Sequence, residues 1–268
     1  MIIPYVSPQE FADAPTGLNI NDLVPNGTQP QESNALMRVL QRASAWIDNV
    51  CQMELRATQN TETKRVWVRK EGWLEIYTNY SPILQVVNLS YRLFAQQEWM
   101  PLDTNDVEIM NHYFRWTGFR LPSCAQLSIQ YTYVNGWAVC MLTQAANAGD
   151  NSITLDNTLG VMPNTVMTIY DGANTEQVTV ASINQNIVTL NNSLQYAHQA
   201  GVHVSSLPDD VRQACIMVAS AFIKERRSGS IIMYGSDGRM SNHEPSATGQ
   251  EDELLLAEEI LMPYKRVI

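Results

Sequence analysis

The sequence predicts an α+β protein in which a helical bundle core carries an antiparallel β-sheet and an inserted all-β domain of barrel or sandwich type. Three observations predict this class. Apolar residues recur with the helical period in the first and last thirds of the chain, and they alternate with polar residues in between. Residues 140–206 contain no lysine or arginine. We therefore expect residues 1–139 and 207–268 to form one connected domain, with residues 140–206 inserted as a second.

Two helices are expected near the start of the chain. Ser7-Pro8-Gln9-Glu10 has the residues of a capping box with proline at the first helical position, so a short helix should begin at Pro8. A long helix should run from about Glu32 to Met53. Its apolar residues form one stripe of period 3.6, namely Leu36, Val39, Leu40, Ala43, Ile47, Val50 and Cys51.

Two further helices are expected in the last third. The first begins after Pro208 with two aspartates in its first turn and ends in Lys224, Arg226 and Arg227, which complements the helix dipole at both ends. The second covers about residues 251–262 and stops at a proline. Since the apolar stripes of the first and last thirds cannot stay exposed, we expect these helices to pack together.

Strands are expected between these helices. Residues 62–137 alternate in polarity, most cleanly where Leu127, Ile129, Tyr131 and Tyr133 share one face. This pattern predicts a sheet with one buried face.

The inserted residues 140–206 show short β patterns in close succession. About four to six strands within a segment of this length indicate a small barrel or sandwich. Asp171-Gly172 predicts a tight hairpin turn between two of them, with a longer turn through Asn174 as the alternative.

Composition and charge limit the classes of function. Of the 268 residues, 45% are hydrophobic and only 16% charged, and 17 Lys+Arg against 27 Asp+Glu give a net charge of −10. An acidic chain argues against a protein that grips nucleic-acid phosphates, which requires a basic surface. The low fraction of charged residues suggests that part of the protein surface is buried against partners. We expect no membrane span, because the longest apolar run, 214–223, is half the length required, and we expect no signal peptide.

The spacing of reactive residues suggests no catalytic or metal-binding site. The four cysteines form no Cys-x-x-Cys pair, and Cys51 and Cys215 fit the apolar faces of expected helices. His198 and His203 are separated by five residues, which places them on different faces of a strand or helix. No Gly-x-Ser-x-Gly elbow occurs, and the glycine-rich loop 228–250 lacks the flanking elements of a phosphate loop. We therefore expect no enzymatic activity, no metal and no cofactor.

Two groups of basic residues are candidates for partner contacts. Arg226 and Arg227 end the third helix, where capping of that helix is the alternative. Tyr264, Lys265 and Arg266 combine an aromatic ring with two cations, which suits an acidic partner, and disorder of the chain end is the alternative.

A third basic cluster, Lys64, Arg65, Arg69 and Lys70, is expected to be a solvated strand face. Five of the six tryptophans lie between residues 67 and 137. We interpret them as core and interface residues, because the basic groove that holds a nucleic-acid strand is missing.

Several segments, in this order, resemble the head–tail connector (adaptor) proteins of long-tailed bacteriophages. They are YVSPQEFADAPTGL, LMRVLQRASAWIDNVCQMEL, SPILQVVNLS, LSIQYTYVNGW, LPDDVRQACIMVASAFIKERR and LLLAEEILMPYKRV. The helices with RAS-x-W-I-D and LP-x-D-V-x-x-A are the most specific pieces, and their order and spacing carry the resemblance over about residues 4–137 and 205–268. The segment between them resembles a β module inserted in some of these adaptors.

The resemblance implies a structural virion protein. Such proteins form a ring, typically of twelve copies, beneath the portal protein, after assembly in the cytoplasm of the bacterial host. The ring sits at the head–tail interface of the virion, lines the DNA channel and docks the next neck protein, which is a stopper or a tail terminator. An acidic ring would let DNA pass without tight binding.

The resemblance also implies which residues meet the portal. In the family the final helix and the C-terminal tail contact it, which corresponds to about residues 251–268 here. Tyr264, Lys265 and Arg266 are then the first candidates, and loop 228–250 with Tyr234 is a further one.

Three other functions remain alternatives. A stopper or tail-completion protein of the neck is a close relative, although such proteins are usually shorter and richer in strands. A surface- or carbohydrate-binding virion module belongs to a different class, and it is disfavoured because Tyr170 and Tyr196 are the only aromatic residues of 140–206. Scattered histidines disfavour a metal-dependent hydrolase.

Overall fold

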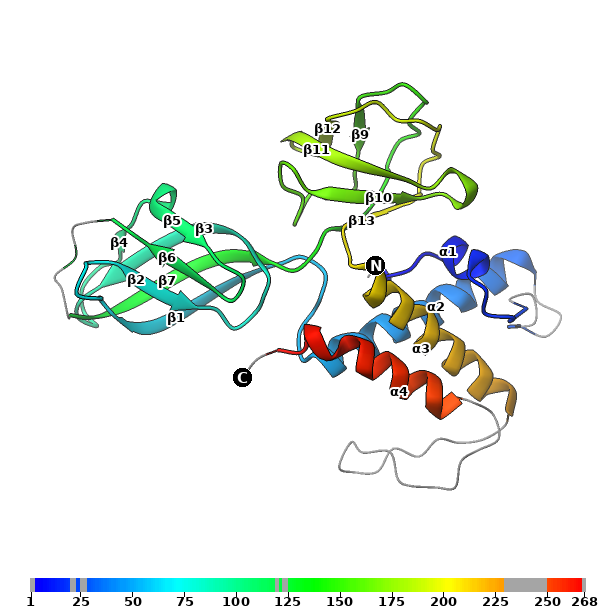
Figure 1. Ribbon diagram of the computed structural model, residues 1–268, viewed down its shortest axis with the longest axis horizontal. Coiled ribbons are helices and arrows are strands. Elements are labelled where there is room, and N and C mark those ends of the chain that lie inside the picture. Colours follow the sequence, from blue (N-terminus) through cyan, green and yellow to red (C-terminus); the bar gives the residue numbers. More distant parts are fainter. Residues whose placement is uncertain are drawn as a thin grey trace.

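The computed structural model describes residues 3–19, 23–24, 28–118, 121, 125–228 and 250–266. Figure 1 shows three parts, which we name by their elements. The helical layer comprises α1–α4, the strand lobe comprises β1–β7 (residues 58–135), and the six-stranded module comprises β8–β13 (residues 139–205). Within the described residues, no helix is both long enough and apolar enough to span a lipid bilayer.

Helix α1 begins where its sequence predicts, and α2 begins three residues before the predicted Glu32. Helix α1 (Pro8–Asp13) starts with the expected capping box, in which the side chains of Ser7 and Glu10 each accept a bond from the other's backbone N–H. Helix α2 (Gln29–Cys51) buries the predicted stripe and ends at Gln52, whose φ of 57° is left-handed.

Helices α3 (Asp209–Ser228) and α4 (Gln250–Leu261) complete the helical layer, and the 3-10 turn η4 (Met262–Tyr264) follows α4. Helix α3 contacts both α2 and α4, so elements far apart in the sequence share one hydrophobic cluster. Buried residues from the three helices include Leu40, Ile47, Val218, Phe222 and Leu254.

The strand lobe consists of two packed antiparallel sheets. One has the order β1-β7-β3-β4 and the other β2-β6-β5. Its strands are β1 (Thr58–Trp67), β2 (Leu74–Tyr77), β3 (Ile83–Arg92), β4 (Met100–Pro101), β5 (Val107–Ile109), β6 (Tyr113–Trp116) and β7 (Gln126–Asn135), with the 3-10 turn η2 (Thr104–Asp106) before β5. The predicted face of Leu127, Ile129, Tyr131 and Tyr133 is fully buried between the sheets.

The six-stranded module is one curled antiparallel sheet of order β8-β13-β10-β11-β12-β9. A bridge between Leu142 and Leu155 joins its two end strands. The strands are β8 (Val139–Met141), β9 (Ser152–Thr154), β10 (Val166–Tyr170), β11 (Glu176–Asn184), β12 (Ile187–Leu190) and β13 (His203–Ser205). Between β10 and β11 lies the 3-10 turn η3 (Gly172–Asn174), so the longer of the two expected turns is the one that forms.

The predicted helical bundle core is wrong, because the chain is mostly β. The four α-helices have 6, 23, 20 and 12 residues, whereas the three described sheets have four, six and three strands. Two of the three hydrophobic clusters consist of sheet residues. The alternating strands pair into layers that bury their own apolar faces, so they need no helix to cover them.

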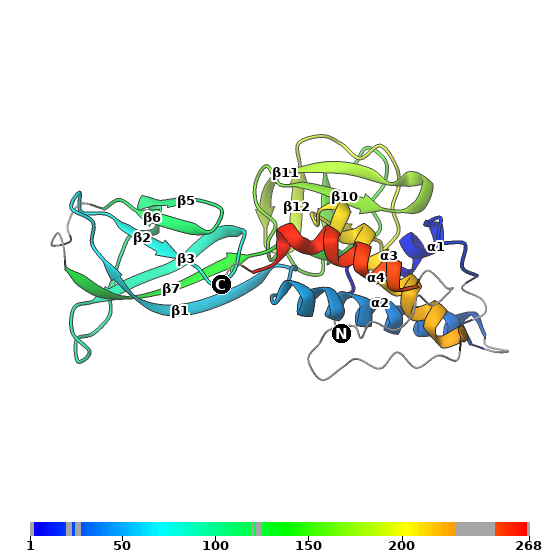
Figure 2. The ribbon, with the colours of Figure 1, turned by 60° about the horizontal axis from the view of Figure 1, so that its bottom comes forward.

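The three parts meet near the centre of the molecule. In Figures 1 and 2 the strand lobe extends to one side, and the helical layer and the six-stranded module lie together on the other. Gly136 and Trp137 link β7 to the module, and the backbone of Trp137 pairs with Leu55 and Ala57, which lead from α2 into β1. The lobe is therefore attached through two adjacent chain segments.

Candidate functional site

The C-terminal candidate Tyr264 folds back onto the protein. Its hydroxyl lies 2.8 Å from both carboxylate oxygens of Asp210 at the start of α3. Its ring meets that of Trp137 edge to face, with centroids 5.6 Å apart. Burial, followed by the hydrogen bond to Asp210, raises the pKa of Tyr264, so the hydroxyl stays protonated and donates. Tyr264 thus ties the end of α4 to α3 and to the link between the parts.

Lys265 and Arg266 also make contacts within the chain. Lys265 Nζ lies 3.0 Å from Glu258 Oε1 on α4. The backbone N–H of Arg266 donates to the carbonyl of Cys51 over 2.9 Å, and its guanidinium carbon lies 5.1 Å from the ring centroid of Tyr80. The segment is therefore part of the folded chain, and its expected contact with a portal stays a prediction.

The remaining predicted contact residues are at or beyond the limit of the description. Arg226 and Arg227 belong to the last turns of α3, but the description does not extend to their side chains. Tyr234 and nearly all of loop 228–250 lie outside the described residues. Their expected partner contacts stay predictions.

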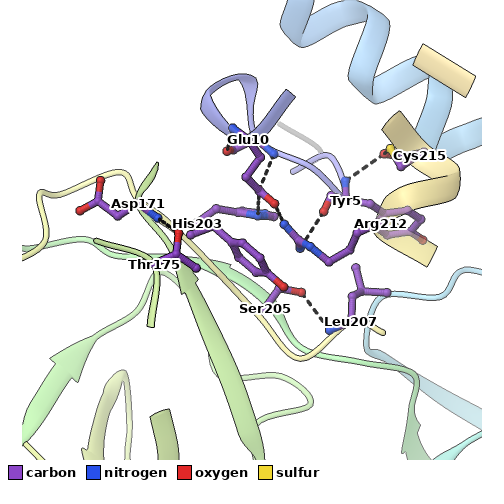
Figure 3. Close-up of polar contacts among 12 residues, drawn as sticks. Tyr5, Glu10, Asp171, Thr175, His203, Ser205, Leu207, Arg212 and Cys215 are labelled. Atoms are coloured by element: carbon purple, nitrogen blue, oxygen red, sulfur yellow. Dashed lines mark hydrogen bonds and ion pairs between the residues drawn. The ribbon is translucent and has the colours of Figure 1, made fainter. Parts of the chain in front are cut away.

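Helix α1, helix α3 and the six-stranded module meet around Arg212, in the first turn of α3 (Figure 3). Its guanidinium forms an ion pair with Glu10 of α1 and donates to the carbonyl of Tyr5 over 3.1 Å. The guanidinium carbon stacks 3.4 Å from the ring centroid of Tyr170 on β10. His203 of β13 completes the cluster, with Nδ1 3.3 Å from Glu10 Oε2.

The charged and titratable side chains of this cluster are buried where the parts of the molecule pack together. Arg212 and His203 are 4% and 2% exposed. Burial lowers the pKa of Arg212 to about 9, so the guanidinium is still charged at neutral pH and pairs with Glu10. Burial also lowers the pKa of His203 to about 4, so the imidazole is neutral at pH 7.

A pocket of about 530 Å³ opens beside this cluster. Its polar lining residues include Gln9, Glu10, Asp13, Tyr170, Asp209 and Arg212. Its carboxylates already have partners within the chain, since Glu10 pairs with Arg212, Asp13 accepts from Gln9 and Asp209 accepts from Tyr170. Across the described part of the chain, no three His, Cys, Asp or Glu side chains are placed to hold a metal ion. The pocket wall is therefore part of the packing contact between α1, α3 and β10.

The two neighbouring histidines contact different groups. His198 is fully buried, with Nδ1 3.0 Å from Asp171 Oδ2 and Nε2 2.9 Å from Glu176 Oε1. His203 faces Glu10 instead. The separation that their spacing predicts is therefore present.

Two exposed surfaces combine apolar side chains with charge. The first, which we call the α4 face, consists of Asp252, Leu255, Leu256 and Glu259. Leu255 and Leu256 are 50% and 49% exposed, although each lies beside residues that α4 buries against α3. The spacing places these side chains on one stripe of the helix.

The second surface, which we call the distal tip, is the end of the strand lobe that points away from the helices. Trp67 lies opposite Gln126, the first residue of β7, whereas the other end of β7 meets the link to the module. Trp67 is 61% exposed and Phe94 is 73% exposed. The distal tip consists of Arg65, Trp67, Arg69, Lys70, Leu93 and Phe94.

The Arg212 cluster is the feature that sequence reasoning missed. The sequence predicts Glu10 only as part of the cap of α1, and it predicts no role for Arg212. The sequence does contain a signal for a buried cation. Arg212 follows Val211 and lies at the edge of an apolar helical stripe that is otherwise continuous. Which carboxylate would neutralise it depends on packing between segments about 200 residues apart, and a single sequence does not show that.

Comparison with known proteins gives no family assignment. No family model matches the chain. No curated protein matches it either. Among solved structures, a chain in the neck of an empty gene transfer agent particle, computed with C6 symmetry, aligns at a TM-score of 0.41 with 12% identity, over 100% of this chain and 97% of that one. A chain in the virion of a native gene transfer agent particle aligns at a TM-score of 0.38 with 13% identity, over 98% of this chain and 93% of that one.

Proposed function

We propose that this chain is a structural protein of a phage-like virion neck, an adaptor whose ring connects the portal to the tail neck and lines the DNA channel. The observation that carries the proposal is the presence of two unlike exposed surfaces, the α4 face and the distal tip, on separate parts of the molecule. Unlike surfaces favour head-to-tail association, and that association closes into a ring when the rotation between copies allows it. The adaptor resemblance of the helices supports the same role.

The charge distribution supports a DNA channel. Twelve copies at −10 each would carry −120 in total. Residues 140–206 contribute only acidic charge, because they contain no lysine or arginine. An acidic lining repels phosphates, so DNA would slide through without being held. No catalytic step is part of this role, and we propose none.

The portal contact is assigned to the end of α4 and the segment that follows it. Met262 is 60% exposed, and after Pro263 the chain continues with Tyr264, Lys265 and Arg266, which are partly buried. An exposed apolar residue beside two cations suits a partner that offers both an apolar and an acidic surface.

The decisive experiment mixes the full-length protein with portal-containing heads and examines the particles by cryo-EM. We expect a ring coaxial with the portal. A protein that stays monomeric and never joins portal-containing heads would overturn the proposal. A protein that joins only after another neck protein has bound would be a stopper or tail-completion protein instead.

A second experiment tests the portal contact. The double variant Lys265→Ser, Arg266→Ser removes both cations but keeps the backbone bond from Arg266 to Cys51. We expect weaker docking onto portal-containing heads with an unchanged unfolding midpoint within about 2 °C. Arg38→Ser, which removes an exposed cation from α2, is the matched control and should dock normally. Unchanged docking of the double variant would show that the assignment of these contact residues is wrong.

A further inference from the structure

Among the described residues, the α4 face is exposed and has the composition of an interface. Leu255 and Leu256 are each about half exposed, on a helix whose other side packs on α3. Asp252 and Glu259 flank the two leucines on the same stripe. The apolar centre with acidic margins calls for a partner that is apolar at its centre and basic at its margins.

Helix α4 is strongly acidic, and two of its acids have cationic partners within the chain. Glu253 pairs with Lys224, and Glu258 pairs with Lys265, within the chain. Asp252 and Glu259 point to the exposed side instead. The charge that the α4 face offers to a partner is therefore negative.

The distal tip has the complementary composition. Arg65 and Trp67 lie on the same outward face of β1, two residues apart. Arg69 and Lys70 follow in the turn after β1, where Arg69 keeps 56% of its side chain exposed although it pairs with Glu75. Glu71 and Glu98 are the exposed acids nearby in the sequence, so basic residues outnumber them.

A second apolar element lies at the same end of the lobe. Strand β3 ends at Arg92, which pairs with Ser128 near the start of β7, and Leu93 and Phe94 follow in the loop. Trp67 and the end of β3 therefore lie on either side of the start of β7, and Phe94 follows two residues after that end of β3. Exposed aromatic residues beside arginines are typical of the centres of protein interfaces.

The two surfaces of one chain do not meet. In Figures 1 and 2 the distal tip lies at the free end of the strand lobe, and α4 lies on the opposite part of the molecule. We infer that the distal tip of one copy docks onto the α4 face of the next copy, with Trp67 against Leu255 and Leu256, and with Arg65 and Lys70 facing Asp252 and Glu259. This inference rests on the proposed ring and assigns the surfaces that close it.

Charge reversal tests the pairing. The tip variant is Arg65→Glu, Lys70→Glu and the helix variant is Asp252→Lys, Glu259→Lys; Arg69 is left alone because it pairs with Glu75. Each variant should lose self-association on portal-containing heads by about tenfold or more, since like charges then face each other. The control variant is Arg38→Glu, an exposed charge on α2, and it should assemble as the unmodified chain does.

Restoration makes the test specific. An equal mixture of the tip variant and the helix variant should assemble, because alternating copies place opposite charges at every contact. The chain that carries all four reversals should also assemble alone. Native mass spectrometry and cryo-EM count the copies, and thermal unfolding shows that each variant is folded.

A third variant covers the case in which a charge reversal unfolds the chain. Leu255→Gln, Leu256→Gln removes the apolar centre from exposed positions and should abolish ring formation while the protein stays folded. The inference is overturned if the reversed variants assemble normally, or if neither the mixture nor the fourfold variant recovers. If the unmodified chain forms no ring at all, both the proposed function and this inference are wrong. If the charge-reversed variants build a normal ring, only the pairing of the distal tip with the α4 face is wrong.

Discussion

The guanidinium carbon of Arg212 lies 3.4 Å from the ring centroid of Tyr170, and this contact joins α3 to the six-stranded module. The same guanidinium pairs with Glu10 of α1, so one buried cation links three elements. A charge buried in this way stabilises the joint only while its partner is present.

Replacement of Arg212 should therefore destabilise the whole arrangement. Arg212→Met leaves the Glu10 carboxylate, whose side chain is 12% exposed, without its cation. We expect a loss of about 3–5 kcal/mol in the free energy of unfolding, measured by urea denaturation at pH 7. Arg38→Met on the exposed side of α2 should change it by less than about 0.5 kcal/mol.

A double variant separates the loss of the ion pair from the loss of packing. Glu10→Gln combined with Arg212→Met removes both charges, so it should be more stable than Arg212→Met alone. Equal stability of the two variants would contradict the account of Arg212 as the partner of a buried carboxylate.

His203 should make stability depend on pH in the acid range. Its pKa is lowered to about 4 in the folded chain, chiefly by burial, with Asp156 and the Pro4 backbone opposing that shift, while the unfolded value is near 6.5. The neutral imidazole favours folding, so its contribution is complete above pH 6.5 and is lost as pH falls toward 4. A shift of this size corresponds to about 3 kcal/mol. His203→Gln should flatten the fall in unfolding free energy between pH 6.5 and 4; an unchanged slope would contradict this.

Glu62 should stabilise the strand lobe as a carboxylate. Burial raises its pKa, but hydrogen bonds from Tyr133 and Tyr131 and the nearby Lys64 outweigh it, so the pKa lies below the usual value of 4.5. Its contribution is therefore present above pH 4.5 and lost as pH falls below that value. Glu62→Gln should cost about 1–3 kcal/mol in urea unfolding at pH 7 and less at pH 3. Glu98→Gln, at an exposed position, should have little effect at either pH.

Gly136 should tolerate no side chain. Its φ is +91°, and a Cβ there would lie 2.6 Å from the carbonyl oxygen of Arg56 and 2.7 Å from that of Leu55. Both neighbours are backbone atoms of the segment that enters the strand lobe, so neither can move without shifting β1. Gly136→Ala should lower the unfolding free energy by more than about 2 kcal/mol, and Gly72→Ala, where φ is +89° but no atom is near, should cost less.

Local structure follows from the sequence wherever the deciding interactions are close along the chain. The capping box at Ser7 and Glu10 and the buried face of β7 are confirmed, because a cap spans three residues and a strand alternates with period two. Cys51 and Cys215 are buried, as their helical stripes predict.

The partnership of these elements was decided only by the tertiary structure. The predicted helical bundle core is wrong because periodicity marks a buried face without saying what covers it, and here the sheets cover each other. The same limit hid the ion pair of Glu10 with Arg212 and the separation of the α4 face from the distal tip. Helix caps and alternating faces are stabilised by interactions within one segment of the chain. The Arg212 cluster and the positions of the two exposed surfaces depend on contacts between segments that only folding brings together.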